Sequence, residues 1–330
     1  MGFRYHLPVD LLFGRGKVSE IGTIASRYGS KALIVTGKGS TKRSGLLDRV
    51  HFYLEETGIR YLLFDKAVPN PTTVLAEDGA KVAAYAGCDL VIALGGGSVI
   101  DCAKSIAFMT CNTGSISDYI FNRKQGTDAL PLIAVPTTCG TGSEANGFAV
   151  LTDPETGDKK SLRRDCIIPA LSIIDPELMQ TMPPEVLASV GFDALCHSME
   201  GFLSAQAQPF TDALTLQAIR AIAAHLPTLY QGSEDADAWD AVTWASTAGG
   251  MVIHTAGVAL PHGMEHPASG LKNIVHGKGL AALTPVITDV SCQAAPERYA
   301  EIARLLGGKK ASECGDMLRR FLAEIGLLTT

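Results

Sequence analysis

Several features on which whole classes of protein depend are missing from this 330-residue chain. Residues 1–8 lack the apolar run of a secretory signal peptide, so export is not expected. The eight cysteines are scattered without a Cys-x-x-Cys pair, which argues against a disulfide framework and favours a reducing cytoplasm. With 19% charged residues and a net charge of -6, the chain offers no electrostatic basis for binding nucleic acid or an anionic membrane. We therefore expect a cytoplasmic globular protein.

No stretch of the chain has the composition of a membrane span. The uncharged run 245–264 is rich in Gly, Ser, Thr and His and contains Pro261, so we interpret it as a buried helix. The sequence also lacks internal repeats and low-complexity segments. Its length is sufficient for two domains that each bury a core.

The two halves of the chain differ in the pattern of their apolar residues. In the first half, apolar and β-branched runs alternate with helical patterns, which indicates parallel strands covered on both faces. These runs are 31–36, 89–94 and 130–136. In the second half, helical spacing extends over 184–204, 209–225, 236–257 and 296–326. Three prolines within 174–184 mark a junction. The sequence thus predicts an α/β nucleotide-binding domain, residues 1–180, followed by an all-helical domain, residues 181–330.

A glycine triplet follows the second predicted strand. Gly95, Gly96 and Gly97 precede Ser98 and a helical pattern, so phosphates can approach the backbone and the positive end of a helix. Asp101, in this helical pattern, is a further candidate cofactor-binding residue. The alternative is a tight turn in which Ser98 and Asp101 form a capping pattern. Lys104, further along, is expected to be solvated or to pack.

Two more loops support a nucleotide site. Thr137, Thr138 and Thr141 lie in a Gly/Thr loop after the third predicted strand, where ligands of an open α/β sheet bind. After the first strand, Gly37 occupies a position where an acid would bind ribose hydroxyls, and Ser40 lies nearby with two basic residues at 42 and 43. The missing acid favours NADP(H) over NAD(H), unless the two basic residues merely face water.

Five metal-binding side chains occur in two short windows of the second half. Asp193 and His197 lie four residues apart, which places both on one face of a helix. His262 and His266 repeat this spacing, and His276 follows ten residues later. Isolated histidines are usually core or surface residues, but a set of imidazoles with a carboxylate suits iron(II) or zinc. Four of the five suffice as ligands, and the fifth can carry a proton beside the metal. Spacing alone leaves open which one that is.

The chain resembles the iron-containing (group III, metal-dependent) alcohol dehydrogenases. Seven ordered motifs carry the resemblance, at 12–16, 95–104, 136–144, 175–177, 191–197, 262–266 and 276–277. The resemblance implies a Rossmann-like amino-terminal domain, a helical carboxyl-terminal domain with the dehydroquinate synthase-like architecture, and a cleft that holds nicotinamide cofactor and metal. It also implies a homodimer, and a helical domain whose last helices are missing from the chain.

The resemblance assigns a role to each candidate residue. The metal ligands fall on Asp193, His197, His262 and His276, and the unligated active-site histidine falls on His266. The cofactor phosphates fall on Gly95 to Ser98, the nicotinamide side falls on Thr137, Thr138 and Thr141, and further contacts fall on Asn70 and Lys160. Because it has Gly37 in place of an acid, the chain resembles the NADP(H)-dependent butanol dehydrogenase and aldehyde reductase branch.

The expected reaction is hydride transfer between a nicotinamide cofactor and a small primary alcohol or aldehyde, with the metal polarising the oxygen and His266 relaying the proton. Two alternatives remain open at this point. One is a lyase of the dehydroquinate synthase kind, although the helical half lacks a Lys/Arg cluster for a substrate phosphate beside its histidines. The other is a catalytically disabled protein that binds nucleotide or metal.

Overall fold

The computed structural model describes residues 2–328, which form two compact units. The α/β unit consists of residues 8–137 and 143–181. The helical unit consists of residues 138–142, the chain from 182 onward and the amino-terminal segment up to Leu7. The loop 138–142 therefore belongs to the helical unit although the strand before it belongs to the α/β unit.

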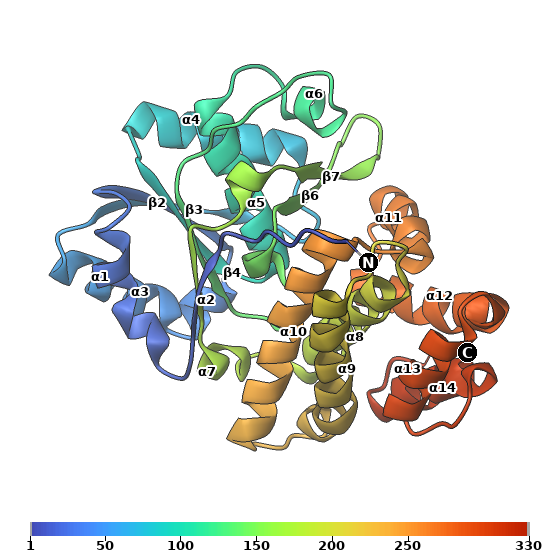
Figure 1. The fold of residues 1–330 in the computed structure, drawn as a ribbon. Helices are drawn as coiled ribbons and strands as arrows, with labels where there is room; N and C mark the ends of the chain where they lie inside the picture. Colours follow the sequence, from blue (N-terminus) through green and yellow to red (C-terminus); the bar gives the residue numbers. More distant parts are fainter. Residues whose placement is uncertain (1, 329–330) are drawn as a thin grey trace. The chain divides into compact units, whose positions relative to one another are not determined.

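The α/β unit contains a six-stranded parallel sheet (Figure 1). Its strands lie in the order β1 (Asp10–Phe13), β8 (Leu171–Ile174), β5 (Leu132–Pro136), β4 (Leu90–Gly95), β2 (Lys31–Gly37), β3 (Arg60–Ala67). The three predicted strands are confirmed as β2, β4 and β5, which are neighbours in the middle of the sheet. The sequence did not indicate β1, β3 or β8. The middle strands were recognisable because both of their faces are buried and, apart from Lys31 at the start of β2, their residues are apolar or small.

Successive residues of β2 face opposite layers of the unit. Ala32 and Ile34 belong to the core under α1 (Ile21–Ala25) and α3 (Leu46–Glu56). Leu33 and Val35 belong to the core under α4 (Thr73–Ala86) and α5 (Gly97–Cys111). This alternation follows from the period of two in an extended chain, and it gives the sheet helices on both sides.

The α/β unit contains further small elements outside the six-stranded sheet. They are the short helices α2 (Ser40–Arg43), α6 (Ile116–Ile120) and α7 (Pro176–Met179), and the antiparallel hairpin of β6 (Phe148–Thr152) and β7 (Lys159–Arg163). Asp175, between β8 and α7, is fully buried and accepts hydrogen bonds from the backbone N–H groups of Gly16 and Val18. The Asp-Pro-Glu motif therefore fastens the turn after β1 to the end of β8.

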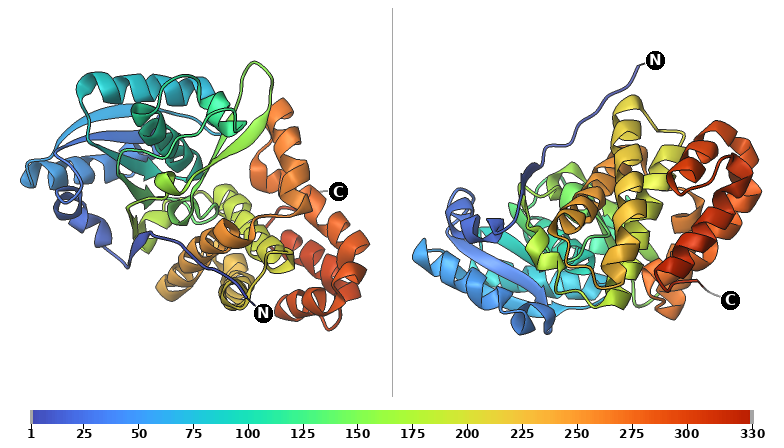
Figure 2. Two further views of the ribbon diagram at one scale, coloured as in Figure 1. Left: turned by 45° about the horizontal axis from the view of Figure 1, so that its top comes forward. Right: turned by 90° about the horizontal axis from the view of Figure 1, so that it is seen from below.

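The helical unit is built from seven helices between 182 and 328, in yellow to red in Figure 2. They are α8 (Pro184–Leu203), α9 (Pro209–Tyr230), α10 (Ala236–Ala256), α11 (Leu260–Lys272), α12 (His276–Ser291), α13 (Pro296–Leu305) and α14 (Cys314–Glu324). The predicted helices at 184–204, 209–225 and 236–257 are confirmed within a few residues. Along the described chain, no helix is both long enough and apolar enough to cross a bilayer.

Two helix predictions were wrong, because a break interrupts each predicted helix. The uncharged run 245–264 is not one helix, because α10 ends at Ala256 and Gly257 adopts a positive φ of 72° before α11 begins. The pattern over 296–326 is also two helices, interrupted near Gly307, where φ is 95°. In both cases a glycine in the left-handed region ends the helix, which apolar periodicity alone does not reveal.

Candidate metal and cofactor sites

Helix α8 supplies the first two candidate metal ligands. Asp193 and His197 lie one turn apart on its buried face and are 3% and 6% exposed. The helix starts at Pro184, where proline is favoured because the first N–H needs no partner inside the helix. It lies against α9 at Gly191, where a Cβ atom would be 2.6 Å from Leu226. The expected pairing of Asp193 and His197 on one helix face is confirmed.

Two further helix starts bring the other histidines to α8. His262 lies in the first turn of α11 and is 2% exposed, and His276 is the first residue of α12. Asn273 ends α11 with a φ of 51°, which allows the chain to turn into α12 within a few residues. Gly277 then lies so close to α8 that a Cβ atom would be 2.1 Å from the Ser189 carbonyl oxygen.

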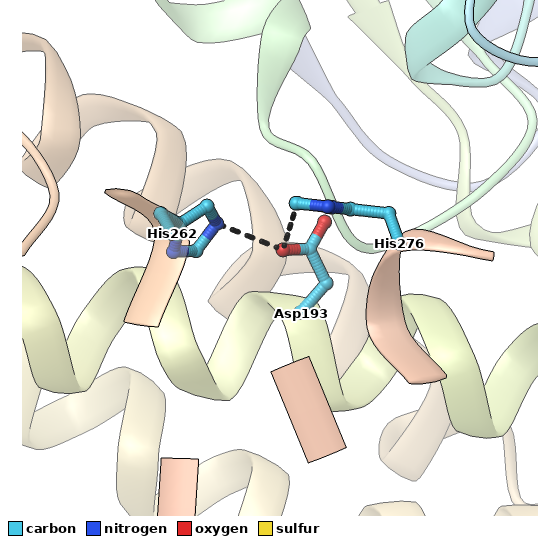
Figure 3. A group of neighbouring side chains, drawn as sticks. All are labelled: Asp193, His262 and His276. Atoms are coloured by element: carbon cyan, nitrogen blue, oxygen red, sulfur yellow. Dashed lines mark ion pairs between the residues drawn. The ribbon is translucent and has the colours of Figure 1, made fainter. Parts of the chain in front are cut away.

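The four side chains converge on one carboxylate oxygen. The Nε2 atoms of His197, His262 and His276 lie 3.6, 3.3 and 3.5 Å from Asp193 Oδ1. Figure 3 shows His262 and His276 approaching the Asp193 carboxylate from opposite sides. Four ligands arranged as a tetrahedron around an ion about 2.1 Å away would be about 3.4 Å apart. The three distances to Asp193 Oδ1 match this spacing, and the ligand atoms of Asp193, His262 and His276 lie within 4.8 Å of one another.

The hydrogen bonding supports a cation at this point. Asp193 Oδ1 and His262 Nε2 are buried and, within residues 2–328, have no hydrogen-bond partner. An unpaired buried polar atom costs about 1–3 kcal/mol, so two of them facing each other call for a group that satisfies both. A divalent cation does so, because carboxylate oxygen and neutral imidazole nitrogen are both ligands. The ligand atoms of Asp193, His262 and His276 all lie within 4.8 Å of one another, as a common ion requires.

The surroundings shift the pKa values of these groups in different directions. Burial acts to raise the pKa of Asp193, but electrostatic interactions with the surrounding histidines His197, His276 and His262 hold it well below its ordinary range. Burial lowers the pKa of His197 to about 4, so this imidazole is neutral and able to coordinate. Burial also acts to lower the pKa of His262, but Glu200 and Asp193 raise it to about 10.

His266 lies beside this group. It follows His262 by one turn of α11, and its ring centroid is 5.9 Å from that of His262 and 5.5 Å from that of His276. The side chain is only partly buried, unlike His262. A partly exposed imidazole next to the ligands has the position needed to pass a proton between the site and solvent.

Two buried glutamates complete the site, and the sequence reading missed both. Glu200 Oε1 accepts a 2.6 Å hydrogen bond from His262 Nδ1, and Glu265 Oε2 accepts a 2.5 Å hydrogen bond from His276 Nδ1. A usable signal was present, because Glu200 lies seven residues after Asp193 on the same face of α8. Glu265 likewise follows His262 by three residues.

The loop 138–142, which carries Thr138 and Thr141, is tied to the metal ligands within the helical unit. His197 Nδ1 donates a 3.3 Å hydrogen bond to the Gly140 carbonyl oxygen. A Cβ atom on Gly140 would be 2.4 Å from Val190 Cβ, and one on Gly250 would be 2.1 Å from the Gly142 carbonyl oxygen. The glycines of this loop thus allow close contact with α8 and α10, a packing role that the sequence did not indicate.

In the α/β unit, the glycine triplet lies at the carboxyl end of β4. Gly95 has a φ of 158°, and a Cβ atom there would be 2.6 Å from Val99. Helix α5 starts at Gly97, and its N-cap residue Gly96 makes no side-chain capping bond. The Ser98–Asp101 capping interpretation is therefore wrong, because Ser98 already lies within the helix. The first amides of a 15-residue helix are left available for an anion, as dinucleotide phosphates require.

Asp101 and Lys104 form a polar network behind this helix start. Asp101 accepts hydrogen bonds from Ser143 Oγ at 2.6 Å and from the Val150 N–H at 2.9 Å. Lys104 is fully buried and donates to Ser143 Oγ, Asn146 Oδ1 and the Phe148 carbonyl oxygen at 2.9, 3.0 and 2.7 Å. Of the two expectations for Lys104, packing is confirmed and solvation is wrong. Burial lowers the pKa of Lys104 to about 8.

The neighbouring strand ends hold other predicted cofactor residues. Gly37 ends β2, Ser40 begins α2, and the Thr137 N–H donates a 3.1 Å hydrogen bond to the Gly95 carbonyl oxygen. A Cβ atom on Gly37 would meet only the Ala67 carbonyl oxygen at an ordinary 3.6 Å, so packing does not require glycine there. A small pocket borders this region, lined by residues that include Ser40, Arg49 and Thr137.

The last two predicted residues also belong to the α/β unit. Asn70 follows β3 and adopts a φ of 52°, a conformation that asparagine tolerates better than most residues. Lys160 lies on β7, with Nζ 4.4 Å from the centre of the Phe121 ring. Both are therefore held by local structure beside any role toward a cofactor.

Comparison with known proteins shows to which family the chain belongs. The model of iron-containing alcohol dehydrogenases matches residues 8–176, and the carboxyl-terminal model of the same family matches residues 187–330. The chain belongs to the iron-containing alcohol dehydrogenase family. It is accordingly a metal-dependent alcohol dehydrogenase or aldehyde reductase, which transfers hydride between a nicotinamide cofactor and a small alcohol or aldehyde.

Individual relatives support this assignment. The chain is 33% identical to the NAD-dependent methanol dehydrogenase of Bacillus methanolicus over 303 residues, covering 92% of this chain and 80% of the relative. It is 34% identical to the NADPH-dependent butanol dehydrogenase of Clostridium saccharobutylicum over 327 residues, covering 98% and 83%. The structure of an archaeal alcohol dehydrogenase from a Red Sea brine pool superposes with a TM-score of 0.96 at 33% identity, covering 100% of this chain and 88% of that one. The Red Sea brine pool alcohol dehydrogenase shares the fold of this chain, and the lyase alternative loses its support.

Proposed function

We propose that Asp193, His197, His262 and His276 hold one divalent metal ion in this alcohol dehydrogenase. The observation that carries the proposal is the pair of buried, unsatisfied acceptors, Asp193 Oδ1 and His262 Nε2, 3.3 Å apart. Three imidazoles and one carboxylate suit iron(II), and they accept zinc as well. The family supports iron as the first choice.

A divalent metal at this position supplies Lewis acidity toward the substrate oxygen, and the nicotinamide supplies or accepts the hydride. The protein contributes the arrangement of the ligands and a route for the proton. His266 takes the hydroxyl proton of the alcohol at its imidazole, or returns it to the product of aldehyde reduction. Its partly exposed position one turn from His262 supports this role.

The cofactor is proposed to bind the α/β unit along the ends of β2, β4 and β5. The amides at Gly96, Gly97 and Ser98 receive the phosphates, and Gly95 permits the sharp turn before them. Asp101 supports this loop from behind, since its carboxylate oxygens accept bonds from Ser143 and Val150. Thr137, Thr138 and Thr141 are proposed on the nicotinamide side, and Asn70 and Lys160 as further contacts.

NADP(H) is proposed as the preferred cofactor. Gly37 leaves space and no negative charge at the position where an acid would repel a 2′-phosphate. Ser40 begins α2, and Arg43 of the same short helix approaches Gly39 within reach of this space. Lys42, by contrast, is 2.6 Å from Asp65, so its charge is already neutralised in part. The NADPH-dependent butanol dehydrogenase relative supports this choice, whereas the methanol dehydrogenase relative is NAD-dependent.

The substrate is proposed to be a small primary alcohol or its aldehyde, as the names of the butanol and methanol dehydrogenase relatives indicate for those proteins. A homodimer is proposed from the family resemblance. A cytoplasmic location is supported by the eight cysteines, all of which are free thiols and most of which are buried.

The proposal is tested by following NADPH and NADH absorbance when butyraldehyde is added to protein loaded anaerobically with iron(II) or zinc. We expect oxidation of the cofactor, faster with NADPH, that stops when a chelator removes the metal. Turnover that survives complete metal removal would contradict the metal centre. No turnover with either cofactor, despite bound metal, would favour the catalytically disabled alternative.

A further inference from the structure

Two buried carboxylates lie directly behind the proposed metal ligands. Glu200 is 2% exposed and accepts the Nδ1 hydrogen of His262, while Glu265 is fully buried and accepts that of His276. Burying a carboxylate is costly unless it is hydrogen-bonded, so each glutamate needs the imidazole that it contacts.

These contacts determine which nitrogen of each ring faces the metal. When Nδ1 carries the hydrogen and donates it to a carboxylate, the lone pair of neutral imidazole lies on Nε2. In both histidines it is Nε2 that lies near Asp193 Oδ1, at 3.3 Å for His262 and 3.5 Å for His276. The carboxylates therefore fix both the tautomer and the orientation of the ring.

Glu200 also fixes the position of the helix that carries His262. Its Oε2 atom accepts a 2.6 Å hydrogen bond from the Ala259 N–H, at the N-cap of α11, where no side chain of α11 itself forms a cap. A negative charge at a helix start is favourable because the first amides have no partner in the helix. The stripe Asp193, His197 and Glu200 on α8 thus provides two ligands and the anchor for the third.

Glu265 has a similar place behind α12. It follows His262 by three residues on α11 and reaches across to the first residue of α12. Gly279 leaves room for it, since a Cβ atom at that position would be 2.7 Å from Glu265 Cγ. The two glutamates therefore connect the helix starts that the metal site depends on.

We propose that Glu200 and Glu265 are positioning residues of the metal centre, which hold His262 and His276 with Nε2 toward the ion and thereby determine metal affinity. This inference rests on the proposed metal site and adds to it a requirement for buried carboxylates that do not touch the metal. Carboxylates that orient ligating histidines typically contribute about 10- to 100-fold in metal affinity.

The test compares metal binding by the wild-type chain with that of Glu200→Gln and Glu265→Gln. Glutamine keeps the shape of the side chain but removes the charge. Cobalt(II) serves as the probe, because its affinity can be measured by competition with a chelator and its visible spectrum reports ligand geometry. We expect each variant to bind cobalt(II) about 10- to 100-fold more weakly and with an altered spectrum.

Asp235→Asn provides the matched control. Asp235 is a carboxylate that caps α10 by accepting hydrogen bonds from the N–H groups of Asp237 and Ala238, but it lies at a helix start that carries no ligand. This variant should lower the melting temperature slightly while keeping the affinity and spectrum of the wild type. A purely structural role for Glu200 would produce the same result as Asp235→Asn.

The possible outcomes distinguish failure of the positioning role from failure of the proposed metal site. If the wild type binds no cobalt(II), the metal site itself is wrong and the inference falls with it. If the wild type binds and both glutamine variants bind equally tightly with unchanged spectra, the metal site stands and the positioning role is refuted. Should Glu200→Gln fail to fold, Glu265→Gln decides the question at His276.

Discussion

Adding one methyl group at Gly277 should disrupt the metal site, whereas the same change at Gly263 should not. Each glycine directly follows a proposed ligand, His276 in α12 and His262 in α11. The Cβ atom of Gly277→Ala would be 2.1 Å from the Ser189 carbonyl oxygen, whereas that of Gly263→Ala would meet nothing within 4 Å. The two variants therefore differ in packing and not in chemistry.

The size of the effect follows from this contact. Ordinary Cβ contacts begin at 3.4 Å, so the first turn of α12 must move away from α8 by about 1 Å. Metal sites tolerate deviations of about 0.2 Å in ligand distance, so His276 would lose its contact with the ion. Overpacking of this kind also costs about 1–3 kcal/mol in stability, more than the gain of up to about 1 kcal/mol for replacing glycine in a helix.

The assay is cobalt(II) or zinc affinity by chelator competition, together with the melting temperature of the metal-free protein. Gly277→Ala should bind at least about tenfold more weakly and melt earlier. Gly263→Ala should bind as the wild type does and melt at the same temperature or slightly higher. A Gly277→Ala protein with wild-type affinity would refute the claim that the α8–α12 contact holds His276 in the coordination sphere.

Three further predictions address other parts of the protein. Lys104→Met should destabilise the chain, and more so at high pH. The pKa of Lys104 in the folded state, about 8, lies below its ordinary value of 10.5, so the unfolded chain binds more protons between these two pH values. The contribution of Lys104 to stability therefore rises with pH in this range. The difference in melting temperature between wild type and Lys104→Met, measured below and above pH 8, should therefore increase, and a constant difference would contradict the lowered pKa. Gly37→Asp should shift the ratio of kcat/KM for NADPH over NADH by about tenfold or more toward NADH, because the new charge repels a 2′-phosphate; an unchanged ratio would remove Gly37 from the specificity argument. His266→Ala should keep its metal while losing about 10²- to 10⁴-fold in kcat, and full turnover with bound metal would eliminate the proton-carrier role.

The sequence alone was sufficient where a pattern depends on local geometry. The buried strands β2, β4 and β5 were visible because parallel strands covered on both faces are continuously apolar. The four-residue spacing of Asp193 and His197 specified one helix face, and the structure places both on α8. The edge strands β1 and β3 were not visible, since a half-exposed strand mixes polar with apolar residues and lacks that signature.

Helix ends were predicted less well than helix interiors. The run 245–264 has the apolar character of one buried helix, yet Gly257 divides it into α10 and α11. That break places the start of α11, and with it His262, next to Glu200. Apolar periodicity does not reveal where a helix ends when the residues on both sides of the end are apolar.

What the sequence determined by itself is the family and the set of candidate metal ligands, because motifs and spacings are properties of short segments. What only the tertiary structure decided is which distant atoms meet. It brings Nε2 of three histidines to one oxygen of Asp193, leaves that oxygen without a hydrogen bond within residues 2–328, and places Glu200 behind His262. Those contacts join residues up to 83 positions apart, from Asp193 to His276, and they depend on helix packing at glycines such as Gly277, which no local pattern encodes.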